Sequence, residues 1–400
     1  MSETSPQALR TPPSRATLIM ITAVSVLTLN LFLPSLPSMA NDLNVSYAKM
    51  SFAIAGYLFL SAGLALILGP LADRFGRRPV LIISFCVFAV ASMGAALAQD
   101  FTTFMAFRMI QAVCATGSTL SRAIVRDMYP PGKGTSVLGY IAMAMAVAPM
   151  IGPLVGGLLE ETLGWRSVFW VFAILGLLSV VLLWFDLGET AKGKVKTAAE
   201  QLQGYKDVTR SAAFWTNTLV LGFSISAFFV FLSGAPLVAS QIYGLSPSFV
   251  GAVMGVTAIG YFIGSFITGR IAETVPLGGM MIWGRWIGLL GPTAALGVVM
   301  LGWDTAYLVF GLMTTVGIGN GISLAAANTG AMSVRPDLAA SAAGLSGAMG
   351  TAMGAVFSAI TGALLTAQNG DWLFCALVML ACLGALIAAY PAAKTFEGIQ

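Results

Sequence analysis

Apolar runs of membrane-spanning length recur along the whole chain, separated by short polar breaks. A helix needs about 20 apolar residues to cross a bilayer core of roughly 30 Å, so each run predicts a membrane helix. The runs lie at 16–38, 48–70, 80–98, 103–123, 136–159, 167–186, 213–240, 248–269, 280–302, 305–328, 340–366 and 372–391. The pattern therefore predicts an all-α membrane protein with twelve transmembrane helices.

The polar breaks differ sharply in charge from one side to the other. Sixteen of the 20 Lys and Arg residues fall in the breaks on one side or at their edges, whereas only Lys49 and Arg166 do so on the other side. Basic residues near short loops stay in the cytoplasm, so we expect both termini to be cytoplasmic. The first run begins near Ala16 and extends past Leu36 without a small-residue cleavage site, so we expect it to be retained as a helix rather than removed as a signal peptide.

The longest basic-side break divides the runs into two sets of six. We predict a cytoplasmic N-terminal segment, a six-helix bundle, a cytoplasmic linker, a second pseudo-symmetric six-helix bundle and a cytoplasmic tail. Their ranges are 1–15, 16–186, 187–212, 213–391 and 392–400. Two similar halves favour a duplicated transporter whose binding site lies between them near the middle of the membrane.

Composition excludes several other functions. With 58% hydrophobic and 9% charged residues and a mean hydropathy of +0.88, the chain could not form a water-soluble surface. The net charge of +4 follows from scattered basic loops, so we expect no nucleic-acid partner. Histidine is absent and the four cysteines lie within apolar runs, which gives no reason to expect a metal, a cofactor or enzymatic activity.

The most specific motif is the basic-side loop 69–81, GPLADRFGRRPVL. Its glycines permit a tight turn, and its aspartate can pair with basic groups. A positive-inside loop that merely contains glycine is the alternative. The stretch resembles the G-x-L-a-D-R-x-G-R-R/K signature of the major facilitator superfamily, which implies a conformational role for Gly69, Asp73, Arg74, Gly76, Arg77 and Arg78.

The fifth run contains APMIGPLVGG at 148–157, which predicts a bent and closely packed helix. A generic packing helix, which would also be bent and closely packed, is the alternative. The segment resembles the antiporter motif of drug/proton exporters in this superfamily, which implies export and a gating role for Pro149, Gly152, Pro153, Gly156 and Gly157.

The fourth run contains FRMIQA at 107–112 and ends in SRAIVRD at 121–127. Both patterns resemble the Bcr/CflA drug-resistance subfamily, and we assign conformational roles to Arg122, Arg126 and Asp127. Arginine inside a membrane helix is costly, so Arg108 is a candidate functional residue, with extension of its side chain to the membrane interface as the alternative.

The first run departs from that subfamily. Its members typically carry D-x-Y-L-P, with the aspartate binding protons or cations, whereas this chain has Asn30-Leu31-Phe32-Leu33-Pro34. None of its acidic residues is expected at mid-membrane depth. Counting 1.5 Å per residue, Asn30 and Arg108 lie at similar depth and could face one cavity. We therefore expect a positive cavity that suits anionic, zwitterionic or strongly polar neutral substrates better than lipophilic cations.

Other polar or aromatic side chains at membrane depth are candidate substrate contacts, with core packing, lipid contact or helix-to-helix hydrogen bonding as alternatives. Arg285 is instead expected to extend to the cytoplasm. The full set of expected substrate-binding residues is Asn30, Tyr57, Arg108, Gln111, Phe228, Phe231, Tyr261 and Asn320.

We expect a secondary exporter of small polar or amphipathic molecules, of the multidrug-efflux type, in the bacterial inner membrane. Alternating access of the two halves would move the substrate, and a monomer in the lipid bilayer is expected to suffice. The resemblance implies protons as coupling partners, but Asn30 removes the usual coupling acid. A metabolite or amino-acid exporter or facilitator without proton antiport is the alternative.

Overall fold

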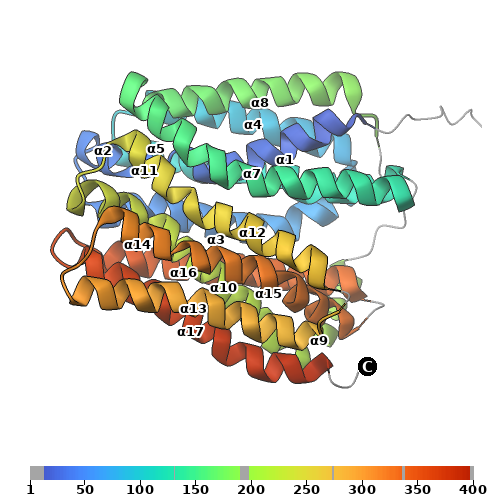
Figure 1. Cartoon of the computed structure of the whole chain (residues 1–400). Helices are drawn as coiled ribbons and strands as arrows, with labels where there is room; N and C mark the ends of the chain where they lie inside the picture. Colours follow the sequence, from blue (N-terminus) through green and yellow to red (C-terminus); the bar gives the residue numbers. More distant parts are fainter. Residues whose placement is uncertain (1–12, 130, 190–197, 273, 336–337, 397–400) are drawn as a thin grey trace, which may run out of the picture.

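The structure is a computed structural model that describes residues 13–129, 131–189, 198–272, 274–335 and 338–396. All secondary structure in these ranges is helical (Figure 1). In chain order the elements are α1 (Arg15–Asn30), η1 (Leu33–Ser35), α2 (Leu36–Asp42), α3 (Tyr47–Phe75), α4 (Arg77–Leu97), α5 (Phe101–Ile110), η2 (Gln111–Ala115), α6 (Thr116–Met128), α7 (Pro131–Leu163), α8 (Arg166–Asp186), α9 (Ala198–Thr209), α10 (Ala212–Leu237), η3 (Val238–Ile242), α11 (Pro247–Met254), α12 (Val256–Ile271), α13 (Leu277–Met300), α14 (Ala306–Leu312), α15 (Thr314–Ser333), α16 (Ala339–Leu364), α17 (Gly370–Ala393) and η5 (Lys394–Phe396).

Eleven helical segments of the described chain are long and apolar enough to cross a membrane. They correspond to all the expected spans except the fourth, 103–123. That segment forms α5, η2 and α6, which follow one another without a gap, and it carries Arg108 and Arg122.

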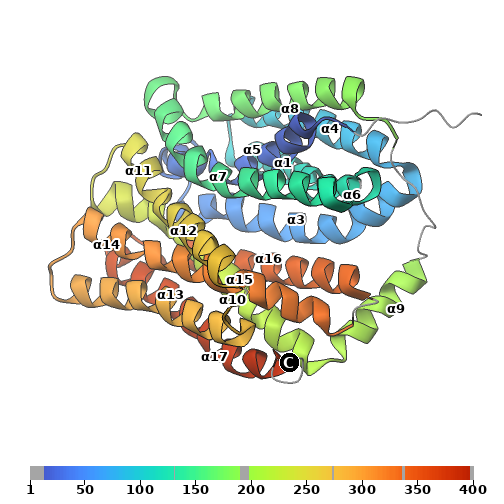
Figure 2. The ribbon, with the colours of Figure 1, turned by 45° about the vertical axis from the view of Figure 1, so that its right-hand side comes forward.

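The helices form two groups (Figure 1). In the first half, α4 packs against α8, and α1 packs against α6 and α7. In the second, α10 packs against α16 and α17, while α15 packs against α12 and α13. Part of the expected linker forms α9, which lies at one end of the molecule (Figure 2).

The halves meet where α3 lies against α16 and where α7 lies against α11. We call the end carrying α2, α11 and α14 the closed end, because the halves touch there. The hydroxyl of Tyr47 on α3 donates to the carbonyl oxygen of Ser233 on α10 at 2.6 Å. We call the other end, where α3 ends and α4 begins, the basic end after residues such as Arg74 and Arg78.

The closest approach at the closed end runs through glycines of α7 and α11. A methyl group at Gly157 would overlap the carbonyl oxygen of Pro247, and one at Gly251 would overlap that of Pro153. The expectation of close packing in 148–157 is thereby confirmed, and at Gly157 the partner is the other half of the molecule.

Two glycine runs of the second half behave differently. Gly317, Gly319 and Gly321 lie against backbone of α12 and α13 and form a packing seam. By contrast, a methyl group at Gly344 or Gly347 would meet no atom within 4 Å, and both glycines line a cavity.

We predict that Gly157→Ala separates the halves at the closed end, because backbone cannot yield as a side-chain tip can; overpacking of this kind costs about 1–3 kcal/mol. Spin labels on cysteines replacing the exposed Asn41 and Trp303, with Cys86 removed, should report longer distances. Gly139→Ala is the matched control on the same helix, since a methyl group there meets nothing within 4 Å. Unchanged distances in Gly157→Ala would contradict the prediction.

Candidate functional site

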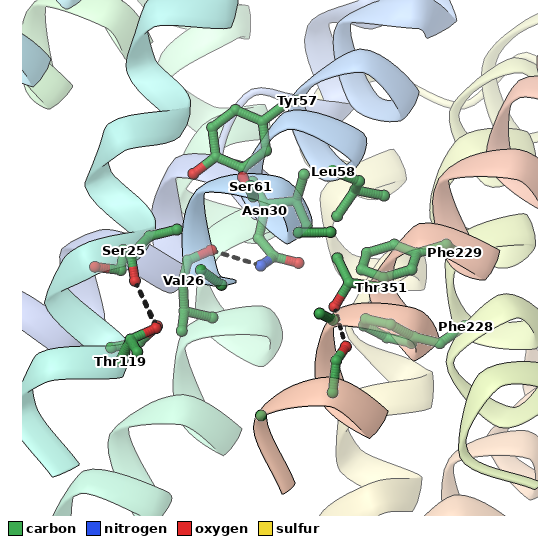
Figure 3. Close-up of a pocket in the computed structure, with 18 of the residues that line it drawn as sticks. Ser25, Val26, Asn30, Tyr57, Leu58, Ser61, Thr119, Phe228, Phe229 and Thr351 are labelled. Carbon is green, nitrogen blue, oxygen red and sulfur yellow. Dashed lines mark hydrogen bonds between the residues drawn. The ribbon is translucent and has the colours of Figure 1, made fainter. Parts of the chain in front are cut away.

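A cavity of about 400 Å³ lies between the two halves, on the basic-end side of the contacts that join them. This volume falls in the range of small-molecule sites. The first half contributes α1, α3, α6 and α7 to its wall, and the second half contributes α10 and α16 (Figure 3). A ligand in the cavity would therefore touch both halves.

Asn30 lies at the end of α1, just before the break around Pro34. Its Nδ2 donates to the carbonyl oxygen of Val26 at 2.7 Å, whereas its buried Oδ1 has no hydrogen-bond partner. The amide faces the side of the cavity where Phe228 and Phe229 lie (Figure 3). An unsatisfied buried acceptor costs about 1–3 kcal/mol, so Oδ1 is suited to receive a donor from a bound molecule.

Tyr57 and Phe228, two further expected contacts, also line the cavity. Behind Tyr57 lies Arg108, whose guanidinium carbon is 4.3 Å from the centre of the Tyr57 ring and 4.2 Å from that of Phe32. The Tyr57 ring therefore stands between the arginine and the cavity.

The expectation that Arg108 is the exposed charge of the cavity is wrong. Its side chain is fully buried and does not belong to the cavity wall. Nε donates to the carbonyl oxygen of Ala53 at 3.2 Å, and Nη2 donates to that of Thr28 at 3.0 Å. Arg108 thus joins α5 to α3 and to α1, because in an apolar interior the guanidinium finds its acceptors on the backbone.

Gln111 continues this network and does not reach the cavity. Its Oε1 accepts from Arg108 Nη1 at 2.9 Å, and its Nε2 donates to Ser92 Oγ on α4 at 2.8 Å. Phe231 also lies away from the cavity, packed against Phe310 and Phe374.

Arg285 does not extend to the cytoplasm as expected, because polar partners hold it within the second half. It is 3% exposed and donates to Asn320 Oδ1 at 2.9 Å and to the carbonyl oxygen of Gly319 at 2.6 Å. Ser224 on α10 and Ser323 on α15 accept further hydrogen bonds from it. Asn320 is consequently a hydrogen-bond partner of Arg285 and does not line the cavity. Tyr261, which is 36% exposed, also lies outside the cavity wall.

The loop motif forms a charge cluster at the basic end around Arg77, which is 3% exposed. Its guanidinium pairs with Asp73 at 3.2 Å and with Asp127 on α6, and its backbone N–H donates to Glu189 at 2.9 Å. Gly76 has a φ of 97° and abuts the Glu189 carboxylate, so both backbone and space favour glycine there.

The remaining expected gating residues are distributed around these features. Arg78 donates to the carbonyl oxygen of Trp184 at 2.8 Å, and Arg74 lies over the Phe75 ring. Gly69 has open space around it, Gly152 lies against Leu27 and Asn30, and Gly156 approaches the carbonyl oxygen of Leu31. Pro149 and Arg122 line the cavity, and the side chain of Arg126 lies outside the described part of the structure.

Several polar cavity residues were not expected from the sequence. The sequence predicts only a conformational role for Arg122, and it gives no prediction for the hydroxyls of α1, α3, α6 and α16 that line the cavity. The spacing of Ser118, Thr119 and Arg122 on α6 is the signal that could have shown a shared helix face. The hydroxyl residues concerned are Ser25, Ser61, Ser118, Thr119 and Thr351.

Comparison with known sequences gives one family. Residues 18–358 match the model of the Major Facilitator Superfamily. A Bacillus subtilis (strain 168) protein named "Uncharacterized MFS-type transporter YdgK" is 30% identical over 350 residues, covering 86% of this chain and 87% of the relative. A Pseudomonas aeruginosa "Chloramphenicol resistance protein" is 32% identical over 246 residues, covering 61% of this chain and 58% of the relative. "Multidrug resistance protein MdtL" of Escherichia coli (strain K12 / DH10B) is 29% identical, covering 58% and 59%.

Solved structures agree in fold. A bacterial homolog of the human lysosomal transporter Spinster, in an inward-facing and unoccupied conformation, gives a TM-score of 0.73 at 18% identity, covering 96% of this chain and 97% of its own. A D-xylose-proton symporter gives a TM-score of 0.74 at 17% identity, covering 93% and 96%. At these identities the likeness concerns the fold alone.

We predict that Arg108→Lys destabilises the protein without any ligand present. An ammonium cannot reproduce the fork that reaches α1, α3 and Gln111, and each lost charge-assisted hydrogen bond costs about 1.5–3 kcal/mol. Thermal unfolding in detergent, followed by tryptophan fluorescence, should show a clearly lower midpoint than in Arg122→Lys, the control at an arginine without such bonds. Equal midpoints, with a loss confined to transport, would contradict a packing role.

Proposed function

The chain belongs to the major facilitator superfamily, and we propose that it is a secondary active exporter of small polar or amphipathic molecules. Its action would be of the multidrug-efflux type and would proceed by alternating access. The observation that carries the proposal is the cavity lined by both halves, which adjoins the basic end and is separated from the closed end by direct contacts between the halves.

The proposed membrane arrangement follows the sequence. We propose that α5, η2 and α6 together make a fourth crossing, which gives twelve crossings in all, and that the basic end faces the cytoplasm. On this arrangement the cavity is open to the cytoplasm of a bacterium and the protein lies in the inner membrane as a monomer. Assignment to the Bcr/CflA-type subfamily rests on the motifs in α5, α6 and α7.

Two observations favour export of drug-like molecules. The α7 segment that resembles the antiporter motif supplies the glycine contacts of the closed end, where opening would release a substrate. Relatives over more than half of this chain carry the names chloramphenicol resistance protein and multidrug resistance protein.

Coupling to protons would need a different acid from the one in the related motif. The cavity wall contains Asn30 and no carboxylate among the described residues that line it. Asp127 or Asp73 in the cluster at the basic end, or a titrating group on the substrate, would have to carry the proton. A metabolite or amino-acid exporter or facilitator without proton antiport remains the second candidate, and the missing cavity acid favours it.

We predict that expression of the chain in an exporter-deficient bacterium raises the inhibitory concentration of chloramphenicol, and that Asn30→Asp shifts the preference toward cations such as ethidium. A carboxylate beside Phe228 would offer cations a counter-charge that the parent lacks. Inhibitory concentrations and ethidium efflux rates measure both effects.

Asn41→Asp is the control for this experiment, because Asn41 is exposed on α2 and does not belong to the cavity wall. Resistance that is absent for every compound, combined with saturable counterflow of a metabolite in vesicles, would reject drug efflux in favour of the second candidate.

A further inference from the structure

Arg122 is the charged residue of the cavity wall. It lies on α6 in the half of the cavity nearest the basic end, and no acidic residue is among the described residues that line the same space. Its guanidinium makes no hydrogen bond or ion pair with the described residues, whereas Arg108 and Arg285 each donate several hydrogen bonds. A fixed positive charge with five N–H donors therefore faces the cavity unpaired.

The contact made by the adjacent Ser121 shows how far along the cavity Arg122 lies. Ser121 Oγ lies 3.5 Å from the carbonyl oxygen of Leu18 on α1, so Arg122 is level with Leu18. Asn30 is twelve residues further along α1, or about 18 Å at 1.5 Å per residue. The cavity wall therefore contains two separate polar groups: the acceptor of Asn30 near the closed end and the cation of Arg122 near the basic end.

The hydroxyls near Arg122 are not available as donors to an anion, and Arg122 itself is exposed. The hydroxyls of Ser118 and Thr119, one turn earlier on α6, donate to the carbonyl oxygen of Ala115 at 3.1 and 3.2 Å, which turns their protons away from the cavity. Arg122 thus provides the charged donors at this level. In a recess with apolar walls such as Leu29, Ala65 and Ala343, a single charge acts over a longer range than in water.

We propose that Arg122 binds the anionic group, a carboxylate or sulfonate, of an amphipathic substrate that enters from the basic end. This inference rests on the proposed function and names the substrate class of the same cavity. The apolar part of the substrate lies deeper, toward Phe228 and Leu58, which line the cavity from opposite halves. A cationic substrate meets an unopposed positive charge on entry and is selected against.

The test uses two dyes with a common xanthene framework and opposite charge, fluorescein and rhodamine 123, bound to the purified full-length protein in detergent. Fluorescence polarisation should show tighter binding of fluorescein by the parent protein. Arg122→Gln should weaken fluorescein binding about tenfold, the equivalent of one charge-assisted interaction, and should strengthen or leave unchanged the binding of rhodamine 123. Arg122→Lys keeps the charge and should retain most of the affinity.

Arg270→Gln is the matched control, since it removes an arginine at the basic end whose guanidinium lies over the Phe266 ring and outside the cavity wall. The proposal is overturned by a parent protein that fails to bind fluorescein or prefers rhodamine 123, and equally by Arg122→Gln weakening both dyes alike. Efflux of neutral chloramphenicol from cells tests the exporter proposal separately from the anion site. If this efflux persists while the dye result fails, the exporter proposal stands and only the anion site is rejected.

Discussion

A guanidinium buried in an apolar bundle must find acceptors, and where no carboxylate is within reach it takes them from the backbone. Arg108 does this with the carbonyl oxygens of Ala53 and Thr28. The free energy of several charge-assisted hydrogen bonds, together with two aromatic faces, offsets the several kcal/mol needed to desolvate the ion. The consequence is geometric: α1, α3 and α5 are held at fixed positions, and Tyr57 is held as the wall between the ion and the cavity.

The second half contains a comparable arrangement at another place. Arg285 on α13 reaches Gly319 and Asn320 on α15 and Ser224 on α10, so three helices share one ion. A buried cation thus links helices within each half. The contacts between the halves at the closed end include glycines packed against backbone atoms and the hydrogen bond donated by the Tyr47 hydroxyl. Strong bonds within halves and short-range packing between them suit motion of one half against the other.

The sequence predicts much of the fold because bilayer thickness imposes one length on every apolar run. It also identifies the loop around Arg77 and the glycines of α7, since their spacing is specific. It does not predict which face of a helix a residue occupies. Arg108 and Arg122 are both arginines in the fourth apolar run, and only packing against α1 and α3 shows that Arg108 is enclosed and that Arg122 opens on the cavity. Gly344 and Gly347 illustrate the same limit, because a run of glycines in the sequence does not show whether its residues contact a neighbouring helix or line a cavity.

An unpaired charge on Arg122 would affect the free energy of closing the basic end during a transport cycle. Closing the basic end around an empty cavity would desolvate an unpaired guanidinium, whereas closing it around a bound anion would bury a pair, and the penalty for an uncompensated ion is the larger. A substrate can shift a conformational equilibrium only by its differential affinity for the two states, and here that difference resides in the charge it neutralises. On the anion-site proposal the loaded carrier therefore closes more readily than the empty one, so exchange of substrates across the membrane should outrun net flux. On the same proposal, the absence of a carboxylate at Asn30 and the unpaired cation at Arg122 act together, because the substrate itself would supply the negative charge that related motifs place on the protein.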